Sequence, residues 1–305
     1  MEIPTDSPYK SGYVAVMGKP NTGKSTLINA LLGQKIAAVS PRPQTTRRQQ
    51  LGILTLENAQ IVLVDTPGMH EPRHKLGETM IVEATEALEE SDLAIFLVDA
   101  SQEPGEEDRI LASLFKRLKH TIPVILALNK TDLVSESELV LHQKDYLALL
   151  PQAIPVAISA LQNINLGQLI ETILTNLPEG APLFPEDQLT DLYERDIAAD
   201  LIREAALYHL KDEVPHGITV RVDEFTERNE HGAFIAATIF VERESHKAIV
   251  IGQGGSMLKK IGSDARKEIE TMSGRKVFLQ LRVKVRKNWR NDEKSLRQFG
   301  FGRKK

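Results

Sequence analysis

The feature that most constrains this chain is the stretch Gly18-Lys-Pro-Asn-Thr-Gly-Lys-Ser25, which fits the pattern G-x-x-x-x-G-K-[ST]. The apolar run 13–17 precedes it, and a helical pattern begins at Lys24. This placement between a strand and a helix is what a phosphate-binding loop requires. Backbone N–H groups converge on the phosphates, Lys24 reaches the terminal phosphates and the Ser25 hydroxyl binds Mg²⁺. The candidate phosphate-binding residues are Gly18, Lys19, Pro20, Asn21, Thr22, Gly23, Lys24, Ser25 and Thr26.

Around this loop, the first part of the chain alternates short strands with helices. The expected strands are apolar runs at 13–17, 60–64, 93–98, 124–128 and 155–158, with 52–56 as an edge strand. The helical patterns cover 24–32, 78–90, 106–119, 136–150 and 166–176. Continuous apolar runs are typical of strands buried on both faces of a parallel sheet. We therefore predict a doubly wound, mostly parallel α/β domain over residues 11–177, after an N-terminal tail of residues 1–10.

The pattern changes at a proline-rich stretch, 178–190, which we interpret as a stiff linker. A smaller α+β domain is expected over 191–288, followed by a basic tail at 289–305. Its expected elements are a helix at 191–210, strands at 218–225 and 234–242, two helices flanking a Gly-rich turn, and a strand at 277–287.

A second motif, Asn129-Lys-Thr-Asp132, indicates which base is bound. It follows a buried strand, at the sheet edge where ligands bind in such folds. The Asp132 carboxylate can accept hydrogen bonds from guanine N1–H and the 2-amino group, whereas adenine lacks this donor pair. Ser159 and Ala160 end the next strand, where a backbone N–H can donate to guanine O6. We predict GTP, bound by Asn129, Lys130, Asp132, Ser159 and Ala160.

The stretch Asp65-Thr66-Pro67-Gly68 also ends a strand, and it predicts contacts with the metal and the phosphates. Asp65 is expected to reach Mg²⁺ and the Gly68 N–H to reach the γ-phosphate. A threonine between Ser25 and Asp65 can supply a further Mg²⁺ ligand and move away after hydrolysis. We assign this role to Thr46, with Thr45 as the alternative. The candidate Mg²⁺ ligands are Ser25, Thr46 and Asp65, and the candidate catalytic residues are Lys24, Thr46 and Gly68.

The amino-acid composition predicts where in the cell the protein is found and what kind of partner it binds. The chain has no Cys, which excludes disulfides and thiolate sites. No apolar run reaches the ~18 residues of a membrane helix, and the first residues lack a signal-peptide core, so we expect a cytosolic protein. Residues 245–305 contain 17 Lys and Arg against five Asp and Glu. A basic segment of that density predicts a polyanionic partner.

Within this basic segment, the turn Gly252-Gln-Gly-Gly255 lies between two helical patterns. A Gly-x-x-Gly turn in this context clamps four nucleotides in KH domains, and the order α-β-β-α-α-β predicts the type II arrangement. Apolar neighbours are expected to line a groove for bases, and Lys259 and Lys260 to face phosphates. For Trp289, base stacking and docking onto the second domain are equal alternatives. The candidate RNA-binding residues are Ile249, Ile251, Gly252, Gln253, Gly254, Gly255, Met257, Leu258, Lys259, Lys260 and Trp289.

The motifs stand in the order found in translation-factor-like (TRAFAC) GTPases, and the two halves together resemble the Era family of bacterial ribosome-assembly GTPases. The resemblance runs nearly end to end and rests on 18–26, 43–47, 65–70, 250–262 and 285–290. It implies binding near the 3′ end of small-subunit (16S) ribosomal RNA and action in 30S maturation. It also implies some peripheral association with the inner membrane, and we expect a monomer.

One departure from the Ras-type pattern concerns the residue after Gly68. Met69 stands where Ras-like proteins carry the glutamine that orients the attacking water, so hydrolysis is expected to be slow unless assisted. Family members with an apolar residue here often recruit a potassium ion held partly by the phosphate-loop asparagine, a position that Asn21 occupies. A potassium requirement is therefore a hypothesis.

The alternative interpretation is an interaction protein. In it, the GTPase is coupled to a membrane or protein partner, and the KH-like domain is an adaptor without RNA binding. The intact Gly252–Gly255 turn and the single GTPase domain favour RNA. Salt separates the two interpretations, because RNA binding weakens steeply as salt rises.

Overall fold

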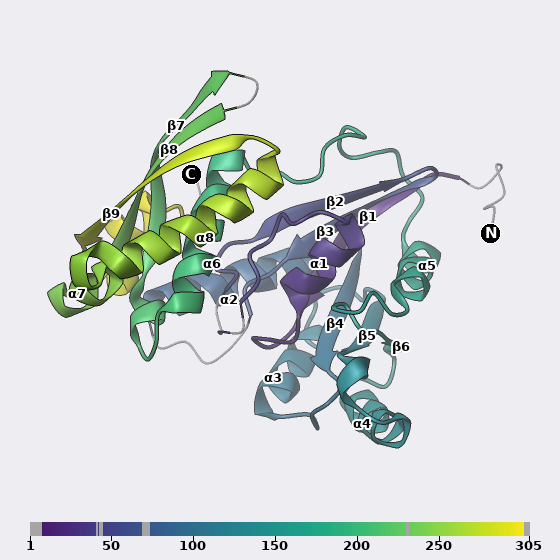
Figure 1. Cartoon of the computed structure of the whole chain (residues 1–305). Helices are drawn as coiled ribbons and strands as arrows, with labels where there is room; N and C mark the ends of the chain where they lie inside the picture. Colours follow the sequence, from purple (N-terminus) through teal and green to yellow (C-terminus); the bar gives the residue numbers. More distant parts are fainter. Residues whose placement is uncertain (1–7, 41, 43–44, 69–73, 230–231, 302–305) are drawn as a thin grey trace. The chain divides into compact units, whose positions relative to one another are not determined.

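The structure, a computed structural model, describes residues 8–40, 42, 45–68, 74–229 and 232–301 (Figure 1). The chain divides into two compact units, which are described separately. The first comprises Met1–Gln34, Thr46–Glu71 and Met80–Asp191. The second comprises Lys35–Thr45, Pro72–Thr79 and Leu192–Lys305.

The first unit is built on a six-stranded sheet in the order β2-β3-β1-β4-β5-β6. β2 pairs antiparallel with β3, and the other neighbours in this sheet are parallel. Every residue of β3 and β4 is buried, as expected for strands covered on both faces. The strands are β1 (Lys10–Met17), β2 (Gln50–Leu56), β3 (Ala59–Asp65), β4 (Leu93–Asp99), β5 (Val124–Asn129) and β6 (Ile154–Ala157). The predicted doubly wound α/β fold is confirmed.

Helices alternate with these strands and cover the sheet (Figure 1). They are α1 (Lys24–Leu32), α2 (Lys75–Glu89), α3 (Glu106–Phe115), α4 (Glu136–Leu149) and α5 (Leu166–Asn176). On one side of the sheet, the Phe96 ring lies between those of Phe115 and Tyr146, with centroids 5.3 and 6.4 Å away. This apolar layer fixes the strands, so the loops at their carboxyl ends lie along one sheet edge.

The proline-rich stretch predicted as a linker packs along the first unit. The Gln60 side chain donates to the carbonyl of Phe184 at 2.9 Å and accepts from the N–H of Leu183 at 2.7 Å. The Ile53 N–H donates to the carbonyl of Leu189 at 2.8 Å. These bonds hold the stretch against β2 and β3.

The second unit has the element order α-β-β-α-α-β, with a three-stranded sheet in the order β7-β8-β9. β7 and β8 are antiparallel, whereas β8 and β9 are parallel. The apolar core contains residues from α6, α8 and one face of the sheet. The elements are α6 (Glu194–His209), β7 (Thr219–Asn229), β8 (Gly232–Val241), α7 (Glu244–Ile251), α8 (Ser256–Ser273) and β9 (Lys276–Val285). The predicted type II KH arrangement is confirmed.

The end of the chain differs from the predicted basic tail. Residues up to 301 form a 3₁₀ turn and the short helix α9 (Glu293–Gln298) and pack on the second unit. Trp289 is fully buried, and its indole N–H donates to the carbonyl of Gly217 at 2.9 Å. Its ring meets Phe299 edge-on and stacks on Phe301, with centroids 5.5 and 6.0 Å away. The prediction that Trp289 contacts RNA is wrong, because no face of the ring is open to a base.

Replacing Trp289 by Ala should lower the stability of the second unit by about 3–5 kcal/mol, the cost of emptying an aromatic site in a core. The urea midpoint followed by circular dichroism measures this loss. Tyr208→Ala is the matched control, because Tyr208 lies in the same unit with 71% of its surface exposed. The control should shift stability by less than about 1 kcal/mol. Equal midpoints for Trp289→Ala and the unsubstituted chain would contradict the packing described here.

Candidate nucleotide site and nucleic-acid interface

The phosphate-binding loop connects β1 to α1, and its shape depends on two glycines. A Cβ on Gly18 would lie 2.5 Å from the carbonyl oxygen of Leu97, and one on Gly23 would lie 2.4 Å from the Asn129 amide nitrogen. Gly23 also has a φ of 100°, which other residues rarely adopt. The sequence pattern therefore reflects backbone packing as well as ligand chemistry.

Lys24 lies inside this loop and is 6% exposed. Its ammonium donates to the carbonyls of Gly18 and Lys19 at 2.9 and 3.1 Å. Burial lowers the pKa of Lys24 to about 8, although the carboxylate of Asp65 opposes the shift. A phosphate placed at the loop would favour the charged ammonium. The position therefore suits a lysine that pairs with an anion.

Two hydroxyls and a carboxylate converge next to the loop. The hydroxyl oxygens of Ser25 and Thr46 lie 2.9 Å apart, and both donate to Asp65 Oδ2 at 3.1 Å. Burial raises the pKa of Asp65 to about 6, although Lys24 and the hydrogen-bond donors oppose the shift. Among the described residues, the buried Oδ1 of Asp65 has no hydrogen-bond partner. These oxygen donors fit Mg²⁺, which binds one or two carboxylates and hydroxyls beside a phosphate.

The two candidate threonines differ in where their hydroxyls point. Thr46 contributes to the cluster of Ser25 and Asp65. The Thr45 hydroxyl instead donates to the carbonyl of Arg42 at 2.9 Å. Of the two threonines, only Thr46 therefore places its hydroxyl in the oxygen cluster that could hold a metal ion.

The stretch after β3 lies against the phosphate-binding loop. A Cβ on Gly68 would be 3.1 Å from Pro20 Cα and 3.3 Å from Lys24 Nζ, so the Gly68 backbone closely approaches both. The Thr66 hydroxyl donates to the carbonyl of Val16 at 2.7 Å. Met69, on which the hydrolysis argument depends, lies outside the described residues.

The guanine-binding candidates from β5 and β6 come together. The Asn129 amide donates to the carbonyl of Thr22 at 2.8 Å and accepts from the Ala160 N–H at 2.9 Å. The Ser159 hydroxyl donates to Asp132 at 2.5 Å, which orients that carboxylate. Lys130 has its ammonium 2.6 Å from Asp99. The motif residues 129–132 and 159–160 thus form one polar group beside the phosphate-binding loop.

Asp108 is a residue of this site that the sequence analysis missed. Its carboxylate is fully buried, accepts from the Gly105 N–H at the start of α3 and lies 3.0 Å from Lys19 Nζ. Lys19 also donates to Gln102 at 3.3 Å. The Lys19 side chain is therefore engaged within the protein, which leaves its backbone for a phosphate. No local pattern signals a pair separated by 89 positions.

In the second unit, the Gly-rich turn joins α7 to α8. Gly252, Gly254 and Gly255 all have positive φ values, of 73°, 58° and 79°. A Cβ on Gly252 would lie 2.7 Å from the Met257 Cβ. The turn is therefore restricted to glycine at these positions by conformation, and at Gly252 by space as well.

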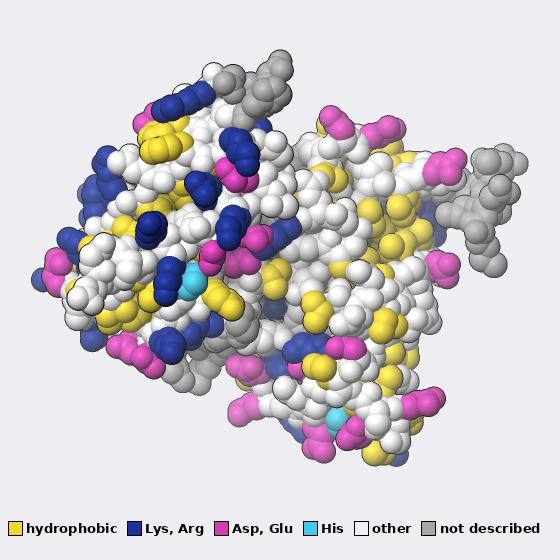
Figure 2. Space-filling view, viewed as in Figure 1, with side chains coloured by type: hydrophobic (Ala, Val, Ile, Leu, Met, Phe, Trp, Pro, Cys, Tyr) yellow, Lys and Arg dark blue, Asp and Glu magenta, His cyan; other side chains and the backbone are white. Residues whose placement is uncertain are grey.

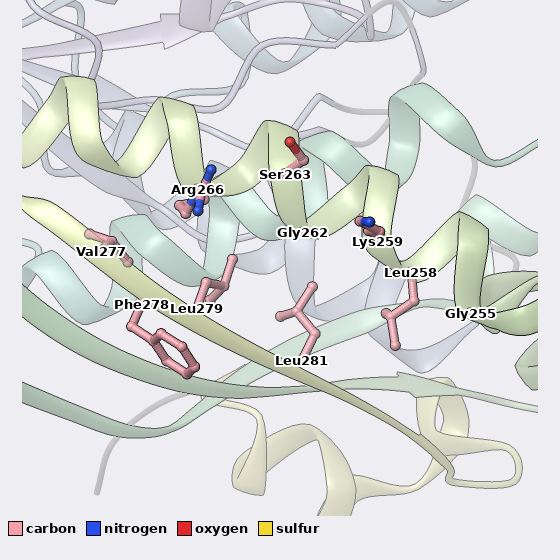
Figure 3. Close-up of a pocket in the computed structure, with 10 residues that line it drawn as sticks. All are labelled: Gly255, Leu258, Lys259, Gly262, Ser263, Arg266, Val277, Phe278, Leu279 and Leu281. Carbon is pink, nitrogen blue, oxygen red and sulfur yellow. The ribbon is translucent and has the colours of Figure 1, made fainter.

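A groove of about 470 Å³ runs from this turn between α8 and β9 (Figure 3). Lys and Arg side chains gather over the face of the second unit that carries α7, α8 and β9 (Figure 2). An apolar floor with a basic rim suits single-stranded nucleic acid. The residues that line the groove are Gly255, Leu258, Lys259, Gly262, Ser263, Arg266, Val277, Phe278, Leu279 and Leu281.

Of the predicted RNA-binding residues, the groove includes Gly255, Leu258 and Lys259. The side chain of Met257 packs against the core, and Ile249 is 48% exposed outside the groove lining. Gln253, Gly254 and Lys260 are exposed, whereas Ile251 and Gly252 are half-buried. The sequence analysis missed the wall formed by β9 and the continuation along α8. The four-residue spacing of Leu258, Gly262 and Arg266, which places them on one helix face, was the available signal.

Within the described part of the chain, no helix is long and apolar enough to cross a membrane.

Comparison with known proteins agrees with both halves of this description. Residues 13–130 match the family described as "50S ribosome-binding GTPase", and residues 213–290 match the family described as "KH domain". GTPase Era of Ruminiclostridium cellulolyticum is 47% identical over 96% of this chain and 98% of its own length.

Two solved structures are similar over nearly the whole chain. A crystal structure of Era in complex with MgGDPNP and nucleotides 1506–1542 of 16S ribosomal RNA matches at 41% identity with a TM-score of 0.91, over 96% of this chain and 99% of that one. A variant of Aquifex aeolicus Era bound to GDP·AlF₄⁻ matches at 41% identity with a TM-score of 0.90, over 95% and 99%. Motifs, element order and similarity over the full length agree, and the chain therefore belongs to the Era family of GTPases.

Proposed function

We propose that this GTPase is a nucleotide-dependent switch that binds the 3′ region of small-subunit (16S) ribosomal RNA and assists maturation of the 30S subunit. The observation that carries the proposal is the groove between α8 and β9, which begins at a Gly-x-x-Gly turn and has a basic rim. The similar Era structure with MgGDPNP and a 16S ribosomal RNA fragment supports the choice of RNA. Action on the ribosomal subunit places the protein in the cytoplasm.

At the nucleotide site, we propose that Ser25, Thr46 and Asp65 hold Mg²⁺, either directly or through water. Their clustered oxygens support this assignment, as does the Asp65 Oδ1, which has no hydrogen-bond partner among the residues that the structure describes. Held by these residues, Mg²⁺ would neutralise the charge that develops on the phosphates. Lys24 reaches the terminal phosphates, and the Gly68 N–H responds to the γ-phosphate because its backbone approaches Lys24. Loss of the γ-phosphate releases Thr46 and Gly68.

Asp132→Asn should change the base preference from guanine to xanthine. Guanine presents two donors to the carboxylate, whereas xanthine has a carbonyl at C2 that the new amide N–H can meet. We expect GDP affinity to fall about 100-fold or more and XDP affinity to rise, measured with fluorescent nucleotides. The exposed Asp145 of α4 gives the control Asp145→Asn, which should leave both affinities unchanged. Retained guanine selectivity in Asp132→Asn would contradict the assigned role.

We further propose that potassium assists hydrolysis, with Asn21 as one of its ligands. Asn21 lies in the phosphate-binding loop with a φ of 66°, a conformation that glycine also adopts. GTP hydrolysis should therefore be faster in KCl than in NaCl of the same ionic strength. Asn21→Gly should remove the difference while keeping GDP affinity within a few fold. Equal rates of the unsubstituted chain in the two salts would refute the role of potassium.

The proposed RNA function is tested by fluorescence anisotropy with a short RNA that copies the 3′ end of 16S ribosomal RNA. We expect tighter binding with a non-hydrolysable GTP analogue than with GDP, and a steep decrease in affinity as salt rises. Gly254→Asp places a negative charge and a side chain at a left-handed position of the turn, so it should weaken binding at least tenfold. Equal RNA affinity in the two nucleotide states would support RNA binding but contradict the proposed nucleotide-dependent switch. Absence of binding in both states would favour a protein adaptor.

A further inference from the structure

The side-chain amide of Gln50 lies beside the oxygen cluster that is proposed to hold Mg²⁺. Gln50 begins β2 and is only 5% exposed, and its amide nitrogen donates to Asp65 Oδ2 at 3.3 Å. An ionised carboxylate only accepts hydrogen bonds, so the amide nitrogen is the end that faces Asp65. Burying an amide costs more free energy than burying an apolar side chain of the same size. A buried glutamine at this position therefore indicates a role at the carboxylate.

The pairing of β2 with β3 places Gln50 next to Asp65. The two strands run side by side (Figure 1), and the two residues lie directly opposite each other at the end of the antiparallel register. Residues opposite each other in such a pair lie on the same face of the sheet, with Cβ atoms about 4.5–5.5 Å apart. The position of the Gln50 amide is therefore set by the sheet and not by a loop.

Gln50 is one of three side-chain donors to the same carboxylate oxygen. The Ser25 and Thr46 hydroxyls each donate to Asp65 Oδ2 at 3.1 Å, whereas the buried Oδ1 has no hydrogen-bond partner among the described residues. Buried carboxylate oxygens normally have partners, so Oδ1 is suited to a ligand from outside the protein. The three donors hold Oδ2 and leave Oδ1 for Mg²⁺ or for a water molecule bound to it.

The three donors differ in how GTP hydrolysis affects them. Ser25 is itself a proposed Mg²⁺ ligand, and Thr46 is the residue proposed to move away when the γ-phosphate is lost. Gln50 belongs to a strand that is paired along its whole length with β3. Its amide is therefore the donor to Asp65 that is neither a proposed metal ligand nor part of a moving segment.

We propose that Gln50 is a positioning residue that keeps Asp65 directed toward Mg²⁺ in the GDP-bound protein, where Thr46 no longer donates. The inference rests on the Mg²⁺ site and the release of Thr46 in the proposed function. Gln50 acts through Asp65 and does not itself bind the metal or the nucleotide. In the GTP-bound protein, Ser25 and Thr46 both hold Oδ2, so loss of the Gln50 donor has a smaller effect there.

The test measures the Mg²⁺ concentration that half-maximally slows the release of a fluorescent nucleotide, first GDP and then a non-hydrolysable GTP analogue. Gln50→Met keeps a side chain of similar length and removes the donor. For GDP, we expect the half-maximal Mg²⁺ concentration to rise about 10- to 100-fold, the range for residues that orient metal ligands. For the GTP analogue, we expect a smaller rise. In EDTA, GDP should leave the variant and the unsubstituted chain at the same rate, because no metal is bound.

Gln49→Met is the matched control, because it makes the same substitution at the preceding residue, which is exposed. It should leave both half-maximal Mg²⁺ concentrations unchanged. Mn²⁺ supplies a readout that does not depend on nucleotide release, since electron paramagnetic resonance measures the free ion directly. The GDP complex of Gln50→Met should bind Mn²⁺ about 10- to 100-fold more weakly than that of the unsubstituted chain.

Four results would overturn the inference, and they can be told apart. Unchanged metal affinity of the Gln50→Met GDP complex would show that the amide does not orient Asp65. Equal losses with GDP and with the GTP analogue would contradict a role specific to the GDP-bound protein. Faster GDP release from Gln50→Met in EDTA would assign Gln50 a structural role only. Failure of Mg²⁺ to slow GDP release from the unsubstituted chain would show that the proposed Mg²⁺ site is itself wrong.

Discussion

The side-chain amide of Asn129 joins the three loops from which the nucleotide site is built. It donates to the carbonyl of Thr22 in the phosphate-binding loop and accepts from the N–H of Ala160 after β6, while its own backbone ends β5. The parallel sheet brings these loops to one edge, but it does not by itself fix the distances between them. The two hydrogen bonds of the buried Asn129 amide fix these distances, because leaving a buried amide unpaired would cost free energy. The loops proposed to contact the base and the phosphates therefore share one hydrogen-bonding centre.

The same edge carries a second arrangement of buried charge. Asp108 at the start of α3 fixes Lys19, and Asp65 at the end of β3 fixes Ser25 and Thr46. Each buried carboxylate is paired with donors from the loop that approaches the phosphates. The first unit thus orders the loop through side chains that need not touch the nucleotide. This division of roles explains why the side chain of Lys19, which lies within the motif, is paired with the Asp108 carboxylate inside the protein.

The sequence predicted those parts of the structure that depend on short-range patterns. The two nucleotide motifs follow apolar strands, and the Gly-rich turn lies between helical patterns, so the residues next to each motif in the sequence predict where it lies in the fold. Contacts between distant residues could not be read in this way. The pair of Lys19 and Asp108 and the hydrogen bond from Trp289 to Gly217 depend on the tertiary fold.

For Trp289, the charged residues nearby in the sequence led to a wrong prediction of an exposed side chain. Several of its neighbours in the sequence are Lys or Arg, which predicts exposure, yet the indole packs against the rings of Phe299 and Phe301. The groove was predicted only along the turn and the start of α8, because its other wall comes from β9, a strand whose neighbour in the sheet is unknown until the fold is formed. The choice between Thr45 and Thr46 likewise required side-chain directions.

β9 is an edge strand of the three-stranded sheet, and its charged positions have a consequence for how the protein behaves at high concentration. An open strand edge can pair with the edge of another molecule, and flat apolar edges are common starting points for aggregation. Lys276, Arg282 and Lys284 alternate along β9 on its exposed side. Two such edges repel each other, so the cations disfavour strand addition between copies of the chain. The wall of the groove can therefore stay open for a ligand without becoming a self-association site.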